Sequence, residues 1–226
     1  MPFKERGLFQ ERLFTKIPNG VEEPHTPSIS RSDLGIPEDS FVICLVSRAR
    51  FDKGWVEAAD AVEHLNLDSP REIHLIMAGN GEAYDYLKQR GSRYVHLLGF
   101  HPAPTDLFTI SDIGILPSYY SGESFPLSVL ECLSTGTPMI STNLGEIPDI
   151  LTDGGGDVAG IIIRMEKGDS KTIEDAISTA MDDRDRYGRM CRTAENLKLR
   201  YDIDRIADDY LAHYRNLLRR VSSTSA

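Results

Sequence analysis

The sequence predicts an α/β fold: a doubly wound, Rossmann-like parallel sheet of about six strands with helices on both faces. Three observations support this prediction. Short apolar segments alternate with helical stretches, a wholly helical region follows Asp169, and the 226 residues are 40% hydrophobic. The alternation is typical of βαβ units in a parallel sheet, and the length and composition suffice for one large core.

The candidate strands are the apolar segments at residues 41–46, 72–77, 94–98, 113–116, 138–141 and 161–163. The helical stretches between them cover residues 55–65, 82–89, 105–111, 127–135 and 145–151. Three further helices are predicted at residues 171–182, 185–199 and 204–219, and we expect them to flank the sheet. The first 40 residues are irregular, because prolines break them at positions 18, 24, 27 and 37.

The composition excludes several classes of function. A formal net charge of -10 argues against a general nucleic-acid or anionic-membrane surface, so any phosphate site must be local. No apolar run approaches the roughly 20 residues that span a bilayer, and the N-terminus lacks the apolar core of a signal peptide, so we expect a cytoplasmic protein. Cys44, Cys132 and Cys191 fit reduced packing residues, and neither they nor the six histidines show metal-ligand spacing, so no metal is predicted.

The most informative motif is the pair Glu123 and Glu131, which spans the start of a predicted helix directly after an apolar strand. Pro126 between them suits the first helical turn. The free N–H groups at a helix N-terminus and its positive dipole end favour an anion such as a diphosphate. Glu123 would lie beside that anion, and Glu131, roughly 8 Å further along the helix axis than Pro126, would reach neighbouring hydroxyls. This arrangement indicates a sugar nucleotide.

Two glutamates at this spacing are also common, and Glu131 alone fits an ordinary solvated helix residue. The context favours the binding interpretation. Open α/β sheets bind ligands at the carboxyl ends of their strands, and the motif begins at such an end.

Basic residues follow the first predicted strand. Arg48 and Lys53 should lie at the carboxyl edge of the sheet, where a guanidinium and an ammonium group would neutralise a diphosphate without a metal. The alternative is a solvated basic loop that pairs with Asp52.

Glycines follow the next two strands. Gly79, Asn80 and Gly81 permit a tight turn and a close backbone approach to a ligand, although a turn with only a structural role fits about as well. Gly99 and Phe100 would supply a backbone or aromatic wall for a base, unless Phe100 is simply part of the core.

Taken together, these motifs resemble the C-terminal domain of retaining glycosyltransferases of family GT4, which have the GT-B architecture. The similarity rests on Arg48, on Lys53-Gly54, on the two glycine motifs and on Glu123-Ser124-Phe125-Pro126 leading to Glu131. Further matches lie at residues 17–22, 136–138 and 145–149, so the resemblance covers roughly residues 15–216.

In that family this half of the enzyme is the donor domain. The resemblance implies that Arg48 and Lys53 hold the diphosphate and that Glu131 binds the ribose hydroxyls. Glu123 would contact the donor sugar and complete the catalytic set. The substrate-binding set also takes in Ser124, Phe125, Leu127 and Ser128. The implied reaction is the retaining transfer of a hexosyl group from a UDP- or GDP-linked sugar to a glycan or glycolipid acceptor, as in polysaccharide biosynthesis, with no cofactor and no metal.

The sequence departs from the family pattern near the expected site, which leaves the identity of the donor sugar open. Ser47 stands where glycine is frequent, Glu146 replaces a usual second glycine, and Asp149 replaces a usual glutamate near the sugar. Pro126 also removes one backbone donor beside the phosphates.

The resemblance also predicts the domain organisation. Residues 1–40 would form the entry segment and interdomain seam, and residues 41–226 the nucleotide-sugar-binding domain with its C-terminal helices. The chain begins where the second half of such enzymes begins, so we expect an N-terminal acceptor domain to act in cis or in trans. Without that domain we expect no useful transfer, and we expect at most peripheral membrane contact through the missing half. The helix at residues 204–219 resembles the one that packs back towards that half.

Two other hypotheses remain open from the sequence. The first is a non-catalytic nucleotide-sugar-binding module with a regulatory or scaffolding role. The second is a Rossmann-type dehydrogenase domain, which is disfavoured because no strand is followed by the full glycine fingerprint and its acidic ribose partner.

Overall fold

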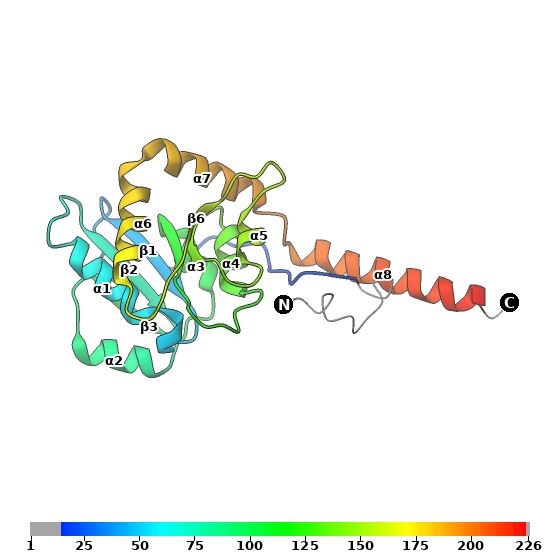
Figure 1. Cartoon of the computed structure of the whole chain (residues 1–226), viewed down its shortest axis with the longest axis horizontal. Coiled ribbons are helices and arrows are strands. Elements are labelled where there is room, and N and C mark those ends of the chain that lie inside the picture. The colour runs from blue at the N-terminus through cyan, green and yellow to red at the C-terminus, as the bar shows by residue number, and fades with distance from the viewer. Residues whose placement is uncertain (1–14, 225–226) are drawn as a thin grey trace.

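The computed structural model describes residues 15–224, and its centre is a six-stranded sheet (Figure 1). The strands are β1 (Phe41–Val46), β2 (Ile73–Ala78), β3 (Val95–Gly99), β4 (Ile113–Leu116), β5 (Met139–Thr142) and β6 (Gly160–Ile163). They lie in the order β3-β2-β1-β4-β5-β6, and every neighbouring pair is parallel. This is the Rossmann strand order, so the predicted fold class is confirmed.

The helices between the strands are α1 (Trp55–Leu65), α2 (Glu82–Arg90), α3 (Pro104–Thr109), α4 (Leu127–Ser134) and α5 (Ile147–Leu151). The C-terminal helices are α6 (Ser170–Asp182), α7 (Arg184–Leu197) and α8 (Ile203–Thr224). Two short 3-10 turns, η3 (Ser32–Leu34) and η4 (Phe51–Lys53), lie on either side of β1. Each predicted helix is therefore present, and the boundaries differ most at the end of α8, which continues past residue 219.

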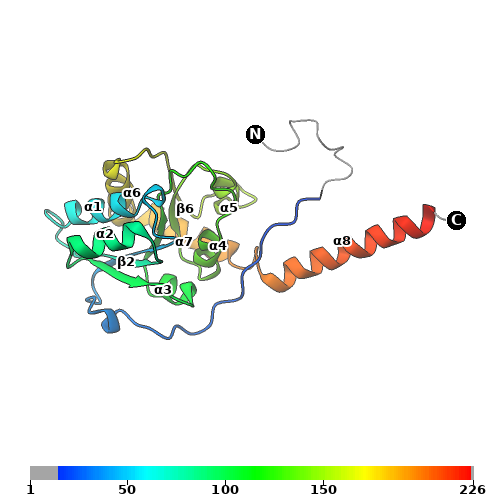
Figure 2. The same ribbon diagram turned by 90° about the horizontal axis from the view of Figure 1, so that it is seen from below.

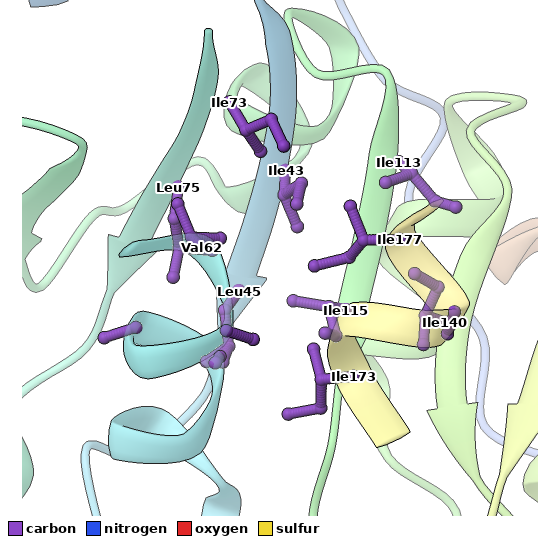
Figure 3. Packing of buried hydrophobic residues seen from close by; sticks show 14 of the residues in the cluster. Ile43, Leu45, Val62, Ile73, Leu75, Ile113, Ile115, Ile140, Ile173 and Ile177 are labelled. Carbon is purple, nitrogen blue, oxygen red and sulfur yellow. The ribbon is translucent and has the colours of Figure 1, made fainter. Parts of the chain in front are cut away.

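Apolar side chains are buried on both faces of the sheet. In β1, Ile43 and Leu45 belong to the cluster that α1 and α6 cover. Val42 and Cys44 alternate with them and belong to the cluster under α3, α4 and α5. Figure 3 shows the first cluster, in which Ile173 of α6 packs beside the strand side chains. Because successive strand residues point to opposite faces, a strand covered on both faces is apolar at every position.

The cysteines pack as predicted. Cys44 and Cys132 are buried, Cys191 is half-buried, and all three are free thiols. Within residues 15–224, no group of histidine, cysteine and acidic side chains is arranged to hold a metal ion. None of the helices in that range is long and apolar enough to cross a bilayer.

The predicted packing of the C-terminal helices is wrong for α8. Helices α6 and α7 lie against the sheet, whereas α8 projects away from it (Figures 1 and 2). Backbone hydrogen bonds from Val21 N to the carbonyl of Tyr201 (2.8 Å) and from Ile203 N to the carbonyl of Val21 (3.0 Å) hold the start of α8 beside the N-terminal segment. Only the start of α8 is therefore held against the domain, and Tyr214 further along the helix is 56% exposed.

The strand order places the loops that matter for function. β1 and β4 are neighbours, and the chain leaves them in opposite directions across the sheet, because β2 follows β1 on one side and β5 follows β4 on the other. Ligands of doubly wound sheets bind at such a switch point, outside the carboxyl ends of the strands. The loops after β1 and β4 carry Arg48, Lys53 and Glu123.

Candidate functional site

The loop after β1 packs directly against the loop after β4. Gly54 has φ 74, and a Cβ atom at this position would lie 2.3 Å from the carbonyl oxygen of Pro117, so only glycine allows the approach. The amide of Tyr119 donates to the carbonyl of Asp52 (3.0 Å), which joins the two loops by their backbones. The residues expected to bind a diphosphate therefore lie on two loops that are joined by backbone contacts.

Lys53 of the loop after β1 and Glu123 of the loop after β4 form an ion pair. Their side chains are 7% and 9% exposed. The ammonium of Lys53 also lies 4.7 Å from the centre of the Tyr120 ring, within the range of a cation–π interaction. Lys53 and Glu123 therefore come together as predicted for one site, but they neutralise each other.

Arg48 has a different environment. Its side chain is exposed and makes no hydrogen bond or ion pair with the residues that the structure describes. Asp52, the alternative partner for this loop, instead binds Arg50 through two hydrogen bonds of 3.0 and 2.7 Å. The alternative of a solvated basic loop that pairs with Asp52 holds for Arg50 and is wrong for Lys53, which is buried and pairs with Glu123. Anion binding by Arg48 stays a prediction.

Ser47 fixes the start of the same loop. Its hydroxyl accepts a hydrogen bond from the indole N–H of Trp55 (2.9 Å) and donates to the carbonyl of Arg48 (3.2 Å). Trp55 is fully buried, so its N–H needs a partner inside the protein. The serine that stands where glycine is frequent in the family thus supplies that partner.

The glycines after β2 approach the chain's own backbone. A Cβ atom on Gly79 would lie 1.9 Å from the carbonyl oxygen of Ser47, and one on Gly81 would lie 2.4 Å from that of Ala49. The amide of Ala49 donates to the carbonyl of Asn80 (3.0 Å) between them. The close backbone approach that these glycines permit is therefore to the loop that carries Arg48, which fits the alternative of a turn with a structural role. A ligand contact at this turn stays a prediction.

The residues after β3 lie at the same edge. Gly99 has φ 69, and its missing Cβ leaves space beside the side-chain oxygen of Asn80, 3.3 Å from where that Cβ would stand. Phe100 is 75% exposed and therefore is not part of the core. The exposed ring remains a candidate wall for a base.

The loop after β4 ends where α4 begins at Leu127, with Pro126 as the N-cap rather than inside the first turn. No side chain caps this end. Among the described residues, the backbone N–H groups of Leu127 and Ser128 have no hydrogen-bond partner, while the amide of Val129 donates to the carbonyl of Pro126 (3.2 Å). Two free N–H groups thus remain at the positive end of the helix.

Glu131 lies in α4, one turn beyond these N–H groups. It is half-buried, and its carboxylate has no hydrogen-bond or ion-pair partner in the part of the chain that the structure describes. Burial raises the pKa of this carboxyl group above its usual value. A half-buried carboxylate without a partner is suited to accept hydrogen bonds from ligand hydroxyls.

Ser124 and Phe125 connect this loop to its neighbours. The carbonyl of Ser124 accepts from the amide of Glu146 (2.8 Å), and the ring of Phe125 packs edge-on against Tyr201 with centroids 5.8 Å apart. The exposed hydroxyl of Ser124 stays at the surface, whereas Phe125 faces the base of α8. Glu146 itself pairs with Lys16 through its side chain.

Sequence reasoning missed Tyr120. Its ring contacts Lys53 and also lies 5.5 Å from the guanidinium carbon of Arg50. The only signal in the sequence is an aromatic residue three positions before Glu123, which does not reveal a contact with a cation 67 positions earlier in the chain.

Comparison with known proteins identifies the family. Residues 28–197 match the family described as glycosyl transferases group 1. The chain belongs to this glycosyltransferase family. The predicted resemblance to the C-terminal domain of a GT-B glycosyltransferase is therefore confirmed, and the dehydrogenase hypothesis is excluded.

Curated relatives of the chain are glycosyltransferases. It is 32% identical over 142 residues to a UDP-Gal:alpha-D-GlcNAc-diphosphoundecaprenol alpha-1,3-galactosyltransferase of Escherichia coli, covering 57% of this chain and 36% of that protein. It is 28% identical over 214 residues to the lipopolysaccharide core mannosyltransferase LpsB of Rhizobium meliloti, covering 88% and 58%. The chain thus spans between about a third and three fifths of the length of these relatives.

Solved structures share the fold. The Anabaena protein HepE in complex with UDP-glucose aligns with a TM-score of 0.75 at 21% identity, over 94% of this chain and 60% of that one. The sucrose-phosphate synthase of Thermosynechococcus elongatus aligns with a TM-score of 0.73 at 19% identity, over 90% and 52%. This likeness extends over nearly the whole chain.

Proposed function

We propose that this chain is the donor-binding half of a retaining, metal-independent glycosyltransferase that moves a hexosyl group from a nucleoside-diphosphate sugar to a glycan or glycolipid acceptor. The observation that carries the proposal is the convergence of unsatisfied binding groups at the switch point of the sheet. Among the described residues, an exposed guanidinium without a partner (Arg48) lies on the loop after β1, and two free N–H groups (Leu127 and Ser128) and an unpartnered carboxylate (Glu131) lie in α4, which follows the loop after β4.

The diphosphate would lie between Arg48 and the N-terminus of α4, with Lys53 below it. Breaking the glycosidic bond transfers negative charge to the leaving phosphate. Fixed cations and oriented N–H groups stabilise that charge without reorganising during the reaction. The chain's contribution to catalysis is then to stabilise the departing nucleoside diphosphate, which makes Arg48 and Lys53 catalytic residues.

The hydroxyl groups of the donor would be bound by the two glutamates. Glu131 lies one helical turn from the phosphate site and would accept from the ribose hydroxyls, and Glu123 would contact the transferred sugar. The base would lie towards Gly99 and the exposed ring of Phe100. Relatives and neighbours whose names include UDP-galactose or UDP-glucose support a UDP-linked donor, with a GDP-linked donor as the other candidate.

No metal is needed in this scheme, because two cations and two N–H groups supply the positive charge that a metal ion otherwise provides. We therefore expect chelators to leave donor binding unchanged. The acceptor wall of the cleft would come from an N-terminal domain in cis or in trans, since transfer requires the acceptor to be held against the donor.

Three measurements test the proposal. A thermal-shift screen with UDP, GDP, ADP and their sugars should identify one base that stabilises the chain, by about 2.7 kcal/mol at a ligand concentration 100 times its dissociation constant. Adding the acceptor half of a related enzyme should then give transfer from a radiolabelled donor, with the anomeric configuration retained in the product by NMR. Arg48→Ala should lower turnover more than it weakens donor binding. A product with inverted anomeric configuration would contradict the retaining mechanism. A strict Mg²⁺ requirement for donor binding would contradict the assignment of this site.

A further inference from the structure

The ion pair between Lys53 and Glu123 differs from the other ion pairs in residues 15–224. It alone has both side chains almost fully enclosed, at 7% and 9% exposure. A buried ammonium group without a counter-ion is strongly unfavourable, because it loses its hydration and gains nothing in return. Glu123 is the group that neutralises Lys53 in this structure.

The two contacts of the Lys53 ammonium group occupy two of its sides. Glu123 occupies one side of the ammonium group and the ring of Tyr120 lies on another, 4.7 Å from the nitrogen. A diphosphate bound at the N-terminus of α4 would also meet the carboxylate of Glu123, which has the same sign of charge. Lys53 and Glu123 can serve the donor only after they separate.

We infer that Glu123 is an internal counter-ion of Lys53. The diphosphate of the donor displaces the carboxylate of Glu123 from Lys53, and this carboxylate then binds the sugar. The inference rests on the proposed function and adds a coupling to it: phosphate binding and the release of Glu123 towards the sugar are one exchange. The ammonium group keeps one anion throughout, first the carboxylate and then the phosphate. No covalent bond changes in this step.

Tyr120 is the positioning residue in this exchange. The amide of Glu123 donates to the carbonyl of Tyr120 (3.0 Å), so one tight turn carries both the carboxylate of Glu123 and the ring of Tyr120. Gly122 leaves room for the ring in this position, because a Cβ atom there would lie 2.5 Å from the Cζ of Tyr120. The ring carries no net charge and contacts Lys53 itself, so it holds Lys53 in place while the anionic partner of Lys53 changes.

The exchange has a functional consequence. A nucleoside diphosphate without sugar displaces Glu123 but gives it no new hydroxyl partner, whereas a sugar-bearing donor does. The chain should therefore prefer the donor to the product. After transfer, the carboxylate returns to Lys53 and promotes release of the nucleoside diphosphate.

Calorimetry with UDP, GDP, UDP-glucose and GDP-mannose tests the exchange. The variant is Glu123→Gln, which removes the negative charge of the Glu123 side chain and keeps its shape. The variant should bind the sugar-free diphosphate about tenfold more tightly, the size of effect that one neighbouring charge has on an ionisation equilibrium. Its preference for the sugar-bearing donor should shrink. Glu82→Gln is the matched control, because Glu82 is exposed at the start of α2 and forms no ion pair among the described residues; it should bind UDP and GDP like the unaltered chain.

Tyr120 is tested in the Glu123→Gln background. Tyr120→Leu should weaken binding of the sugar-free diphosphate, and Tyr120→Phe should restore it, because the ring and not the hydroxyl contacts Lys53. Carbon-13 NMR of the unaltered chain is independent of how the variants fold: saturation with UDP or GDP should shift the carboxyl resonance of Glu123 and not that of Glu82.

The outcomes separate this inference from the proposed function. A folded Glu123→Gln variant that binds UDP and GDP no more tightly than the unaltered chain overturns the exchange, as does a Glu123 carboxyl resonance that stays in place at saturation. The proposed function survives both results if Glu131→Ala still weakens binding. If neither the unaltered chain nor any variant binds a nucleoside diphosphate, both fall.

Discussion

Gly54 offers the sharpest test of how the two site loops are held together. It ends the 3-10 turn η4 with φ 74 and ψ 24, and Gly35 ends η3 with almost the same angles, φ 67 and ψ 25. Alanine at either position must adopt the left-handed conformation, which costs about 1–2 kcal/mol. The surroundings differ: a Cβ atom at Gly35 would have no neighbour within 4 Å, whereas one at Gly54 would lie 2.3 Å from the carbonyl oxygen of Pro117.

The difference between Gly54→Ala and Gly35→Ala in the free energy of unfolding therefore measures the contribution of the contact between the two loops. The carbonyl belongs to the backbone, so the loops after β1 and β4 must separate in Gly54→Ala, at an additional cost of about 1–3 kcal/mol typical of overpacking. We expect Gly35→Ala to lower the free energy of unfolding by about 1–2 kcal/mol and Gly54→Ala by about 2–5 kcal/mol. Separation of the loops should also weaken UDP or GDP binding in Gly54→Ala only.

The assay is urea unfolding followed by tryptophan fluorescence, with calorimetry for ligand binding. Trp55 is the only tryptophan and follows Gly54 directly, so its emission reports on this region. If Gly54→Ala destabilises the chain no more than Gly35→Ala and binds nucleotide equally well, the contact with Pro117 does not hold the site together and the reasoning is refuted.

Three further predictions follow from individual contacts. Ser47→Ala should lower the free energy of unfolding by about 1–3 kcal/mol in urea unfolding, because it leaves the buried indole N–H of Trp55 without a partner; an unchanged midpoint would show that the bond contributes nothing. Burial and the charge of His74 lower the pKa of His96 to about 4. The unfolded chain therefore binds more protons between pH 6.5 and 4, so stability should fall as the pH drops through that window, and His96→Asn should flatten the fall in pH-dependent melting curves. Arg48→Ala should weaken UDP or GDP binding by about 1.5–3 kcal/mol in calorimetry while leaving the melting temperature unchanged, since the side chain makes no hydrogen bond or ion pair with residues 15–224; a lower melting temperature would contradict this exposed, unpaired state of Arg48.

The apolar segments alone predict the fold because β1, β2, β4 and β5 are buried at nearly every position. The segment at residues 113–116 is apolar throughout, and it could not be so if one face met water. Strand boundaries follow to within one residue for the same reason. The path of α8 is not predictable in this way: its apolar residues indicate a helix that packs on something, whereas the hydrogen bonds of Val21 that direct it outwards join positions 180 residues apart.

The candidate site shows the same limit. Loops after parallel strands lie at one edge, which is why Arg48, Lys53 and Glu123 could be placed there from the sequence. Their partners depend on side-chain packing, and no local pattern reveals that Lys53 pairs with Glu123 while Arg48 has no partner among the described residues. The role of Gly79 was ambiguous for a related reason: the sequence shows that the backbone is approached closely, and only the structure shows that Ser47 is what approaches it.

Donor binding without a metal is tested by calorimetry of the 226-residue chain with UDP, GDP and ADP in the presence of EDTA. We expect saturable binding of one nucleoside diphosphate, weakened by about 1–3 kcal/mol in Glu131→Ala, because that carboxylate accepts hydrogen bonds from the ribose. A folded chain that binds none of the three nucleotides would contradict this prediction.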